Sequence, residues 1–211
     1  PGFTRKINNR YSKFLIYCQV ETLVFGEAID RALFPERFIV GCMGPNIKLN
    51  KKYHKFLKMF NCPVLPMLYE SAELTKISIN AFLAASVTMS NTLAEISEII
   101  GANWSDVIPS LKLDKRIGQY SYVKPGLGLS GGNIERDLYT IAQLGKKCGT
   151  HFNTVNAIIE NSQHRKDWLW RIFKETRTFE IKNSRIAVLG LSYKENTSSI
   201  KNASSIDFIR Q

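Results

Sequence analysis

The sequence predicts an α/β fold at both ends of the chain and an all-α middle built around one long helix. Three observations lead to this prediction: short apolar runs bounded by turn residues before position 70, a stretch from 73 to 100 without proline or glycine, and another short apolar run near the end. Short bounded runs are typical of strands, whereas an uninterrupted stretch of that length is typical of a helix. We therefore predict three parts, residues 1–70, 71–178 and 179–211.

The first part resembles the later half of an α/β unit. Residues 12–20 and 38–40 are predicted strands, and 62–68, which contains two prolines, is a predicted edge strand or extended connector. Residues 51–60 place their aromatic and leucine side chains on one side, which predicts an amphipathic helix. No G-x-G-x-x-G pattern follows a strand in this part.

The long helix is predicted to run from 73 to 100, a length of about 42 Å. Ser71 is its expected N-cap, Glu73 suits the positive end of its dipole, and Gly101 stands where a C-cap glycine belongs. A helix of this length with so few charges has to be buried on several sides. Because a chain of this size could hardly cover it alone, we predict a homodimer formed through this helix.

The remaining elements are predicted from the same signals. They are a short helix at 103–111, a glycine-rich loop at 118–132, helices at 133–147 and 151–177, a turn at 182–183, a buried strand at 185–189 and a helix that begins near Ser204. The last strand, loop and helix predict the start of another α/β domain.

Composition and charge argue against several classes of protein. No apolar run reaches the ~18 residues that a membrane span needs, and no signal peptide opens the chain, so we expect a cytoplasmic protein without a membrane partner. The four cysteines include no C-x-x-C pair and the three histidines are scattered, which predicts reduced thiols and no metal site.

The net charge of +11 is spread along the chain. Binding of nucleic acid would call for a contiguous basic face with interleaved aromatic residues. The only candidate, residues 48–58, is better explained as an amphipathic helix, so we expect no nucleic-acid partner. Part of the positive charge would suit the diphosphate of a small anionic substrate.

Two constellations could carry chemistry. Lys76 and Asn80 lie four residues apart and so share a helix face, which Asn91 continues. A lysine on an apolar helix either reaches solvent at the helix end or, if buried, could stabilise a developing oxyanion. The second constellation runs from Pro125 to Asp137, where closely spaced glycines open into a helix and would let the backbone approach a ligand.

Several motifs together resemble the UDP-glucose/GDP-mannose dehydrogenase family. They are Glu73-Leu74-x-Lys76-x-x-x-Asn80, the Asp-x-Arg-Ile-Gly stretch with Arg116, the Pro-Gly-x-Gly run at 125–128, residues 185–196, and upstream Glu21 with residues 26–30. The resemblance implies two α/β domains joined by a long helix, with a dimerisation core like that of 6-phosphogluconate dehydrogenase. The chain would then be a fragment that holds the end of the NAD domain, the central helical domain and the start of the nucleotide-sugar domain.

The resemblance also implies an activity and a set of site residues. The activity would be NAD-dependent oxidation of the C6 alcohol of a nucleotide sugar of the UDP-hexose class, twice, to a uronic acid. Lys76 and Asn80 would polarise the sugar oxygen and a bound water, with Asp137 as the acid/base partner and Glu21 assisting hydrolysis. The nucleotide sugar would be held by Arg116 of this subunit or of its partner, by Lys194, and by the backbone of Gly126, Gly128 and Gly131.

One departure from the family bears directly on the reaction. Asn133 stands at the position of the catalytic cysteine, and an amide cannot form a thiohemiacetal. The next cysteine, Cys148, lies beyond the following helix, and Phe25 replaces one of two upstream glutamates. These losses favour a single oxidation that releases a carbonyl product. Oxidation twice through an aldehyde hydrate, a non-catalytic nucleotide-sugar-binding paralogue and a dimerisation fragment remain alternatives. The chain by itself is expected to be inactive and to bind NAD poorly.

Overall fold

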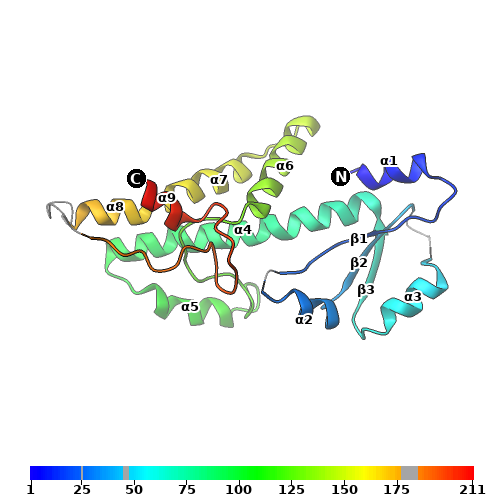
Figure 1. The fold of residues 1–211 in the computed structure, drawn as a ribbon, viewed down its shortest axis with the longest axis horizontal. Coiled ribbons are helices and arrows are strands. Elements are labelled where there is room, and N and C mark those ends of the chain that lie inside the picture. The colour runs from blue at the N-terminus through cyan, green and yellow to red at the C-terminus, as the bar shows by residue number, and fades with distance from the viewer. Residues whose placement is uncertain (25, 45–47, 177–184) are drawn as a thin grey trace. The chain divides into compact units, whose positions relative to one another are not determined.

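The computed structural model describes residues 1–24, 26–44, 48–176 and 185–211, which form two compact units, 1–79 and 80–211 (Figure 1). The first unit holds α1 (Phe3–Arg10), β1 (Cys18–Gln19), α2 (Ala28–Leu33), β2 (Phe38–Cys42), α3 (Lys51–Lys58) and β3 (Val64–Leu68). The long helix α4 (Tyr69–Ile100) begins in the first unit and ends in the second. The second unit also holds α5 (Trp104–Leu113), α6 (Asn133–Cys148), α7 (Asn153–Lys166), α8 (Trp168–Glu175) and α9 (Ser204–Arg210). The predicted fold class, with a long central helix and a small sheet, is confirmed.

The sheet of the first unit has the order β1-β2-β3. β2 pairs in parallel with β3, with α3 between them in the chain, and antiparallel with β1. Val40 and Cys42, on one face of β2, are buried against Leu57 of α3. Gly41, on the other face, lies against Tyr69 and Ala72 of α4, which explains why β2 is apolar on both faces. The predicted strand at 38–40 and the amphipathic helix at 51–60 are therefore confirmed.

The predicted strand at 12–20 is wrong for most of its length. Only Cys18 and Gln19 pair with β2, whereas Phe14 and Leu15 are 68% and 61% exposed. An apolar run forms a strand only where a neighbouring strand accepts its hydrogen bonds. The helices α1 and α2, of eight and six residues, were not predicted, because they are too short to show a clear helical periodicity.

The long helix begins earlier than predicted. It follows β3 directly at Tyr69, so Ser71 lies inside the helix and is not its N-cap. Glu73 does bind backbone N–H groups at a helix start, but that helix is α1: its carboxylate accepts hydrogen bonds from Gly2 N and from Thr4 N and Oγ1. Gly101, with φ +74°, ends the helix as predicted.

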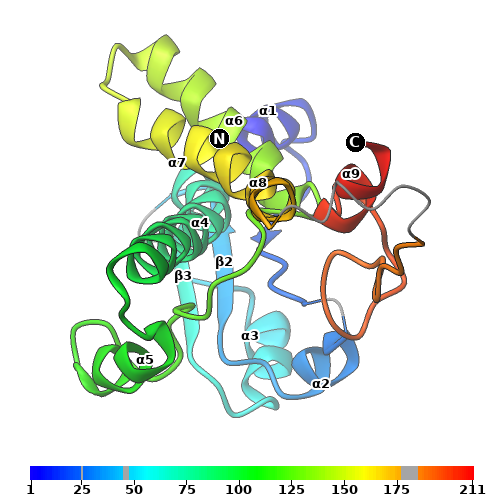
Figure 2. The same cartoon turned by 90° about the vertical axis from the view of Figure 1, so that its left-hand side faces the viewer.

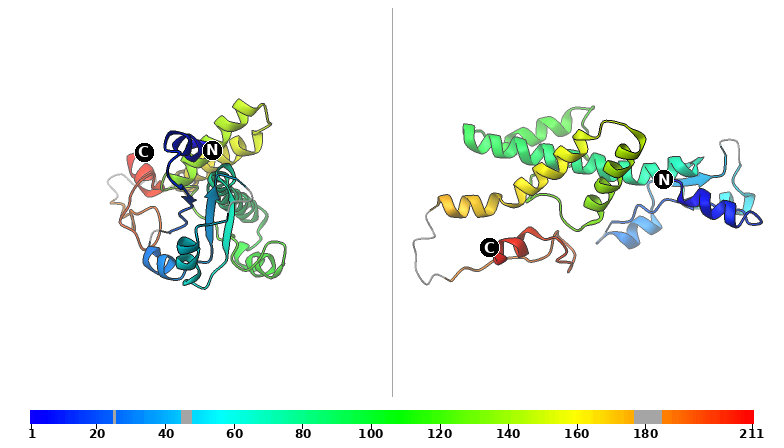
Figure 3. Two further views of the ribbon diagram at one scale, coloured as in Figure 1. Left: turned by 90° about the vertical axis from the view of Figure 1, so that its right-hand side faces the viewer. Right: turned by 90° about the horizontal axis from the view of Figure 1, so that it is seen from above.

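The core of the second unit is assembled by α4, α6, α7 and the loop before α6. Ala84, Leu129, Leu138 and Ile158 are its buried members, one from each of these segments. Figures 2 and 3 show α6 and α7 packed along α4. The glycine-rich loop is thus part of the core and not a linker between domains.

One face of α4 is not buried within the chain. Phe82, Met89, Ile96 and Ile100 are 78%, 60%, 46% and 71% exposed, and with Leu93 the residues from Met89 to Ile100 repeat at alternating intervals of four and three, with Phe82 seven residues before Met89. The expectation that this helix is covered on several sides is therefore not met by the described residues alone. By length and composition α4 could also cross a membrane, with a mean hydropathy of 1.2 in its most apolar window, although such a test also selects core helices of other proteins.

Two predictions for the C-terminal part are wrong. The helix predicted at 151–177 is two helices in its described part, α7 and α8, separated at Asp167. Residues 185–189 are not a buried strand: Ile186 and Leu189 are 58% and 94% exposed, because the described part of the second unit offers no strand to pair with. The helix at Ser204 is confirmed as α9. The turn at 182–183, the boundary at 178/179 and Phe25 lie outside the described residues.

Candidate functional site

Two of the residues singled out in the sequence meet in the second unit. Asn80 Nδ2 donates a hydrogen bond of 2.6 Å to Asp137 Oδ2, across 57 positions of sequence. Asp137 is 3% exposed, and its other oxygen, Oδ1, accepts two hydrogen bonds from the guanidinium of Arg136. A buried carboxylate with both oxygens engaged has a fixed orientation, as an acid/base group needs.

The helix α6 brings Asp137 to this position and begins at Asn133. Asn133 is exposed and lies one turn before Asp137, on the same side of the helix. The same first turn of α6 is bound to two other segments by Glu135, which accepts from Lys166 Nζ at 2.8 Å and from Asn202 Nδ2 at 2.6 Å. The start of α6 is therefore tied both to α7 and to the loop before α9.

The glycine-rich loop approaches other segments closely at its glycines. At Gly128, with φ +80°, an added Cβ would lie 2.6 Å from the carbonyl oxygen of Ser162, so any larger residue would displace α7. Gly131 lies against the ring of Tyr193 and its N–H donates to the carbonyl of Lys201. Gly126 is bound through both its N–H and its carbonyl, to Asn91 and Arg165.

The comparisons with known proteins fit this geometry. Residues 70–163 match the family described as "UDP-glucose/GDP-mannose dehydrogenase family, central domain". Over these residues the chain is therefore similar to the UDP-glucose/GDP-mannose dehydrogenase family. The matched range contains Lys76, Asn80, Arg116, the three loop glycines, Asn133 and Asp137, whereas Glu21 and Lys194 lie outside it.

Curated relatives and solved structures cover the chain nearly end to end. UDP-glucose 6-dehydrogenase TuaD of Bacillus subtilis is 32% identical over 204 residues, which are 95% of this chain and 42% of that protein. UDP-glucose 6-dehydrogenase AglM of Haloferax volcanii is 27% identical over 198 residues, 90% of this chain and 44% of its own. A UDP-glucose dehydrogenase structure from Pyrobaculum islandicum superposes with a TM-score of 0.84 at 24% identity, covering 100% of this chain and 49% of the other. This chain spans less than half the length of these curated relatives.

The other predicted site residues, Arg116, Lys194, Glu21 and Lys76, take no part in the hydrogen bonds between Asn80, Asp137 and Arg136. Arg116 is paired with Asp114, two residues before it, and its side chain is 90% exposed, so the second unit does not bury it. Lys194 is partly buried in the loop that packs on Gly131 through Tyr193. Glu21 is exposed and accepts from Leu23 N, and Lys76 is half-buried; both lie in the first unit, and their roles stay predictions.

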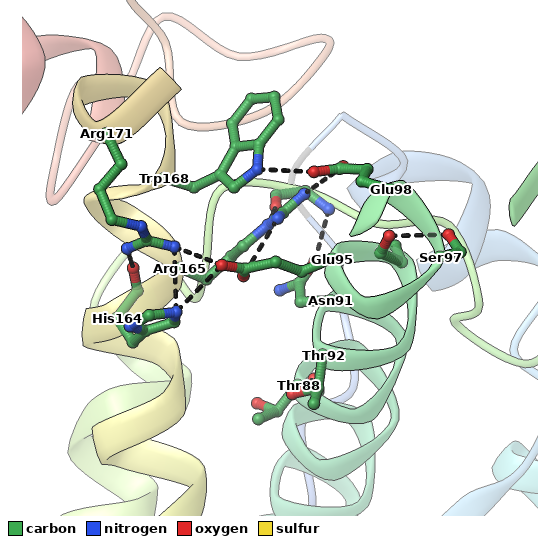
Figure 4. Close-up of polar contacts among 12 residues, drawn as sticks. Thr88, Asn91, Thr92, Glu95, Ser97, Glu98, His164, Arg165, Trp168 and Arg171 are labelled. Atoms are coloured by element: carbon green, nitrogen blue, oxygen red, sulfur yellow. Dashed lines mark hydrogen bonds and ion pairs between the residues drawn. The ribbon is translucent and has the colours of Figure 1, made fainter. Parts of the chain in front are cut away.

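The sequence did not reveal a buried arginine beside the loop (Figure 4). Arg165 of α7 is 5% exposed and contacts Glu95 and Glu98 of α4, and Glu95 also accepts from Arg171 and His164. Burial alone would raise the pKa of Glu95, but the hydrogen bonds from His164 and Arg171 outweigh burial and lower this pKa below its ordinary value of 4.5. These residues are about 70 positions apart, and nothing in the local sequence links them.

Beside this arginine lies an open cavity of about 380 Å³ between α4 and α7. Asn91 and Glu95 line it, but Asn80 and Asp137 do not. Asn91 Nδ2 and Thr88 Oγ1 are buried without a hydrogen-bond partner among the described residues. Among all the residues that the structure describes, no group of three or more histidine, cysteine and acidic side chains could hold a metal ion.

Proposed function

We propose that the protein containing this chain is a cytoplasmic enzyme that oxidises a nucleotide sugar of the UDP-hexose class, with NAD as the hydride acceptor. The observation that carries the proposal is the 2.6 Å hydrogen bond between Asn80 and the buried carboxylate of Asp137, formed where the glycine-rich loop enters α6. It places a group suited to proton transfer beside the glycine-rich loop, whose backbone the family resemblance assigns to the nucleotide sugar. The names of the curated relatives point to the same substrate class.

Each residue in the proposed site has a distinct task. Oxidation of an alcohol to a carbonyl removes a hydride from carbon and a proton from oxygen. Asp137 accepts that proton through a bound water, and Asn80 orients both the carboxylate and the water. Lys76 stabilises the negative charge that develops on the sugar oxygen. Lys194 and Arg116, the latter from either subunit, neutralise charge on the nucleotide.

Among the described residues we assign no binding site for NAD. The parallel β2 and β3 resemble the sheet of a dinucleotide-binding domain, but no glycine-rich turn joins a strand to a helix within the described residues of the first unit. The pattern Gly126-x-Gly128-x-x-Gly131 opens α6 and follows no strand, so it lacks the context of a dinucleotide-binding turn. We therefore assign no residue of this chain to the cofactor.

We further propose that the reaction stops after one oxidation. Without a thiol at position 133, the aldehyde has no internal nucleophile to hold it for a second hydride transfer. The test is to measure NADH formed per nucleotide sugar consumed by the complete gene product, over a panel of UDP- and GDP-sugars. A ratio of one supports the proposal, and a ratio of two shows that the hydrate is oxidised without a thiol. Binding of a nucleotide sugar without any NADH would favour a non-catalytic paralogue.

The exposed face of α4 supports a homodimer. Apolar residues at alternating spacings of four and three form the seam along which two helices pack. The exposed side chains are large, and leaving them in water would be unfavourable. Light scattering after gel filtration should give twice the chain mass, and Met89→Glu should shift the protein towards monomer. A monomeric wild-type protein would contradict this part of the proposal.

A further inference from the structure

The backbone of Gly126 is hydrogen-bonded on both its N–H and its carbonyl by buried side chains. Asn91 Oδ1, on α4, accepts a hydrogen bond of 2.7 Å from Gly126 N, and Arg165 Nε, on α7, donates one of 3.0 Å to Gly126 O. Asn91 and Arg165 are 3% and 5% exposed. Both hydrogen-bonding groups of one glycine are thus fixed by two different helices of the unit's core.

The guanidinium of Arg165 is itself held in one orientation (Figure 4). Nη1 lies 3.3 Å from Glu95 Oε2, and Nη2 lies 3.8 Å from Glu98 Oε1. The guanidinium carbon stands 4.5 Å from the ring centre of Trp168, whose Nε1 donates to Glu98 at 2.9 Å. The guanidinium therefore binds carboxylates along its edge and stacks on an indole with its face. If it rotated, a buried charge would be left unpaired.

The rest of the loop is held by weaker, uncharged contacts. Leu129 N donates to Ser162 Oγ, and Leu127 O accepts from Ser204 Oγ. A segment with four glycines loses much conformational entropy on ordering, so its shape depends on such contacts. Among the described residues, a charged side chain hydrogen-bonds to this loop at Gly126 alone, and hydrogen bonds from charged donors are the stronger ones.

We infer that Asn91 and Arg165 are positioning residues that hold the glycine-rich loop in the shape required to bind a nucleotide sugar. The inference rests on the proposed function, because it assumes that this loop contacts the ligand. Neither residue needs to touch the ligand. Their effect is to order the loop before binding, so that the free energy of binding is not reduced by the cost of ordering it.

The chain offers matched controls. Arg171 also pairs with Glu95 but contacts His164 and not the loop, so Arg171→Gln weakens the same carboxylate cluster without releasing Gly126. Asn91→Asp keeps an oxygen acceptor for Gly126 N, whereas Asn91→Ala removes it. Together with Arg165→Gln, these variants separate loss of the loop contacts from general destabilisation.

The experiment measures two quantities on the complete gene product: hydrogen exchange of the amides of 125–131, and the affinity for UDP-glucose by calorimetry. Arg165→Gln and Asn91→Ala should each speed exchange in the loop and weaken UDP-glucose binding about tenfold or more, since each removes one buried hydrogen bond. Asn91→Asp and Arg171→Gln should stay within about threefold of wild type. The affinity for NAD should not change in any of them.

The two readouts separate failure of this inference from failure of the proposed function. Wild type could bind no nucleotide sugar of the panel while hydrogen exchange at 125–131 still becomes faster in Arg165→Gln. Arg165 then orders the loop, but the proposed function is wrong. If wild type binds UDP-glucose and Arg171→Gln weakens it as much as Arg165→Gln, the effect is general destabilisation and the inference is overturned. Unchanged exchange at 125–131 in Arg165→Gln and Asn91→Ala would overturn it as well.

Discussion

Two carboxylates of the second unit, the buried Asp137 of α6 and the partly exposed Glu95 of α4, have different hydrogen-bond partners. Asp137 is bound by one neutral amide, from Asn80, and by Arg136, whose side chain is 65% exposed and so can move away. Glu95 is bound by Arg165, Arg171 and His164, two of which are also fixed by other contacts. The carboxylate that we propose for proton transfer thus has one partner that can move away, whereas Glu95 is held between two arginines and a histidine.

The largest expected effect is the loss of turnover on replacing Asp137, the carboxylate with fewer charged partners. Asp137→Asn should lower kcat at least ~100-fold, because the amide cannot accept the proton, while the KM for the nucleotide sugar changes little. Steady-state kinetics of NADH formation measure both. Arg136→Gln is the control, since it removes only the exposed partner and should leave most of the activity. Full activity of Asp137→Asn would show that this carboxylate is structural, like Glu95.

Replacing Asn133 tests whether the start of α6 still accepts the family chemistry. Asn133→Cys restores a thiol one turn before Asp137, near the positive end of the helix dipole, which favours the thiolate. We expect the ratio of NADH to sugar to rise from one towards two. Asn133→Ser, of similar size but a poorer nucleophile, should keep the ratio of one. If Asn133→Cys also gives a ratio of one, the contacts of Glu135 hold the start of α6 where the new thiol cannot reach the aldehyde.

Replacing Glu95, the carboxylate with more charged partners, should lower the stability of the protein more than its turnover. Glu95→Gln leaves Arg165 and Arg171 without their shared anion, so the free energy of unfolding should fall by about 2 kcal/mol, below the usual cost for a fully buried pair because Glu95 is partly exposed. Urea denaturation measures this change. The comparison would fail if Asp137→Asn cost as much stability as Glu95→Gln.

The smallest effect is on the acid stability of the first unit. Hydrogen bonds from Arg5 lower the pKa of Glu70 from 4.5 to about 2. Because the folded state then binds fewer protons than the unfolded state, this contribution is fully present above pH 4.5 and is lost as the pH falls towards 2. Screening by solvent keeps it small, since Glu70 is 41% exposed. Thermal melts between pH 5 and 2 should show a shallower loss for Glu70→Gln than for wild type.

Much of the fold was readable because it depends on local patterns. The apolar β2, the amphipathic α3, the long α4 with its terminal glycine and the start of α6 at Asn133 all follow from side-chain periodicity and helix-end residues. Ser71 and Glu73 were misassigned because the chain passes from β3 into α4 without a loop. The strands at 12–20 and 185–189 failed because a strand is decided by its pairing partner.

The sequence by itself provided the motifs that resemble the family, the pair of candidate groups on α4 and α6, and the prediction that Asn133 stands at the family's cysteine position, because residue types at fixed spacings carry that information. Only the tertiary structure decided that Asn80 meets Asp137, that Glu73 binds the start of α1, and that Arg165 holds Gly126. Each of these contacts joins residues at least 39 positions apart. Their partners are selected by the packing of whole elements, which no local pattern specifies.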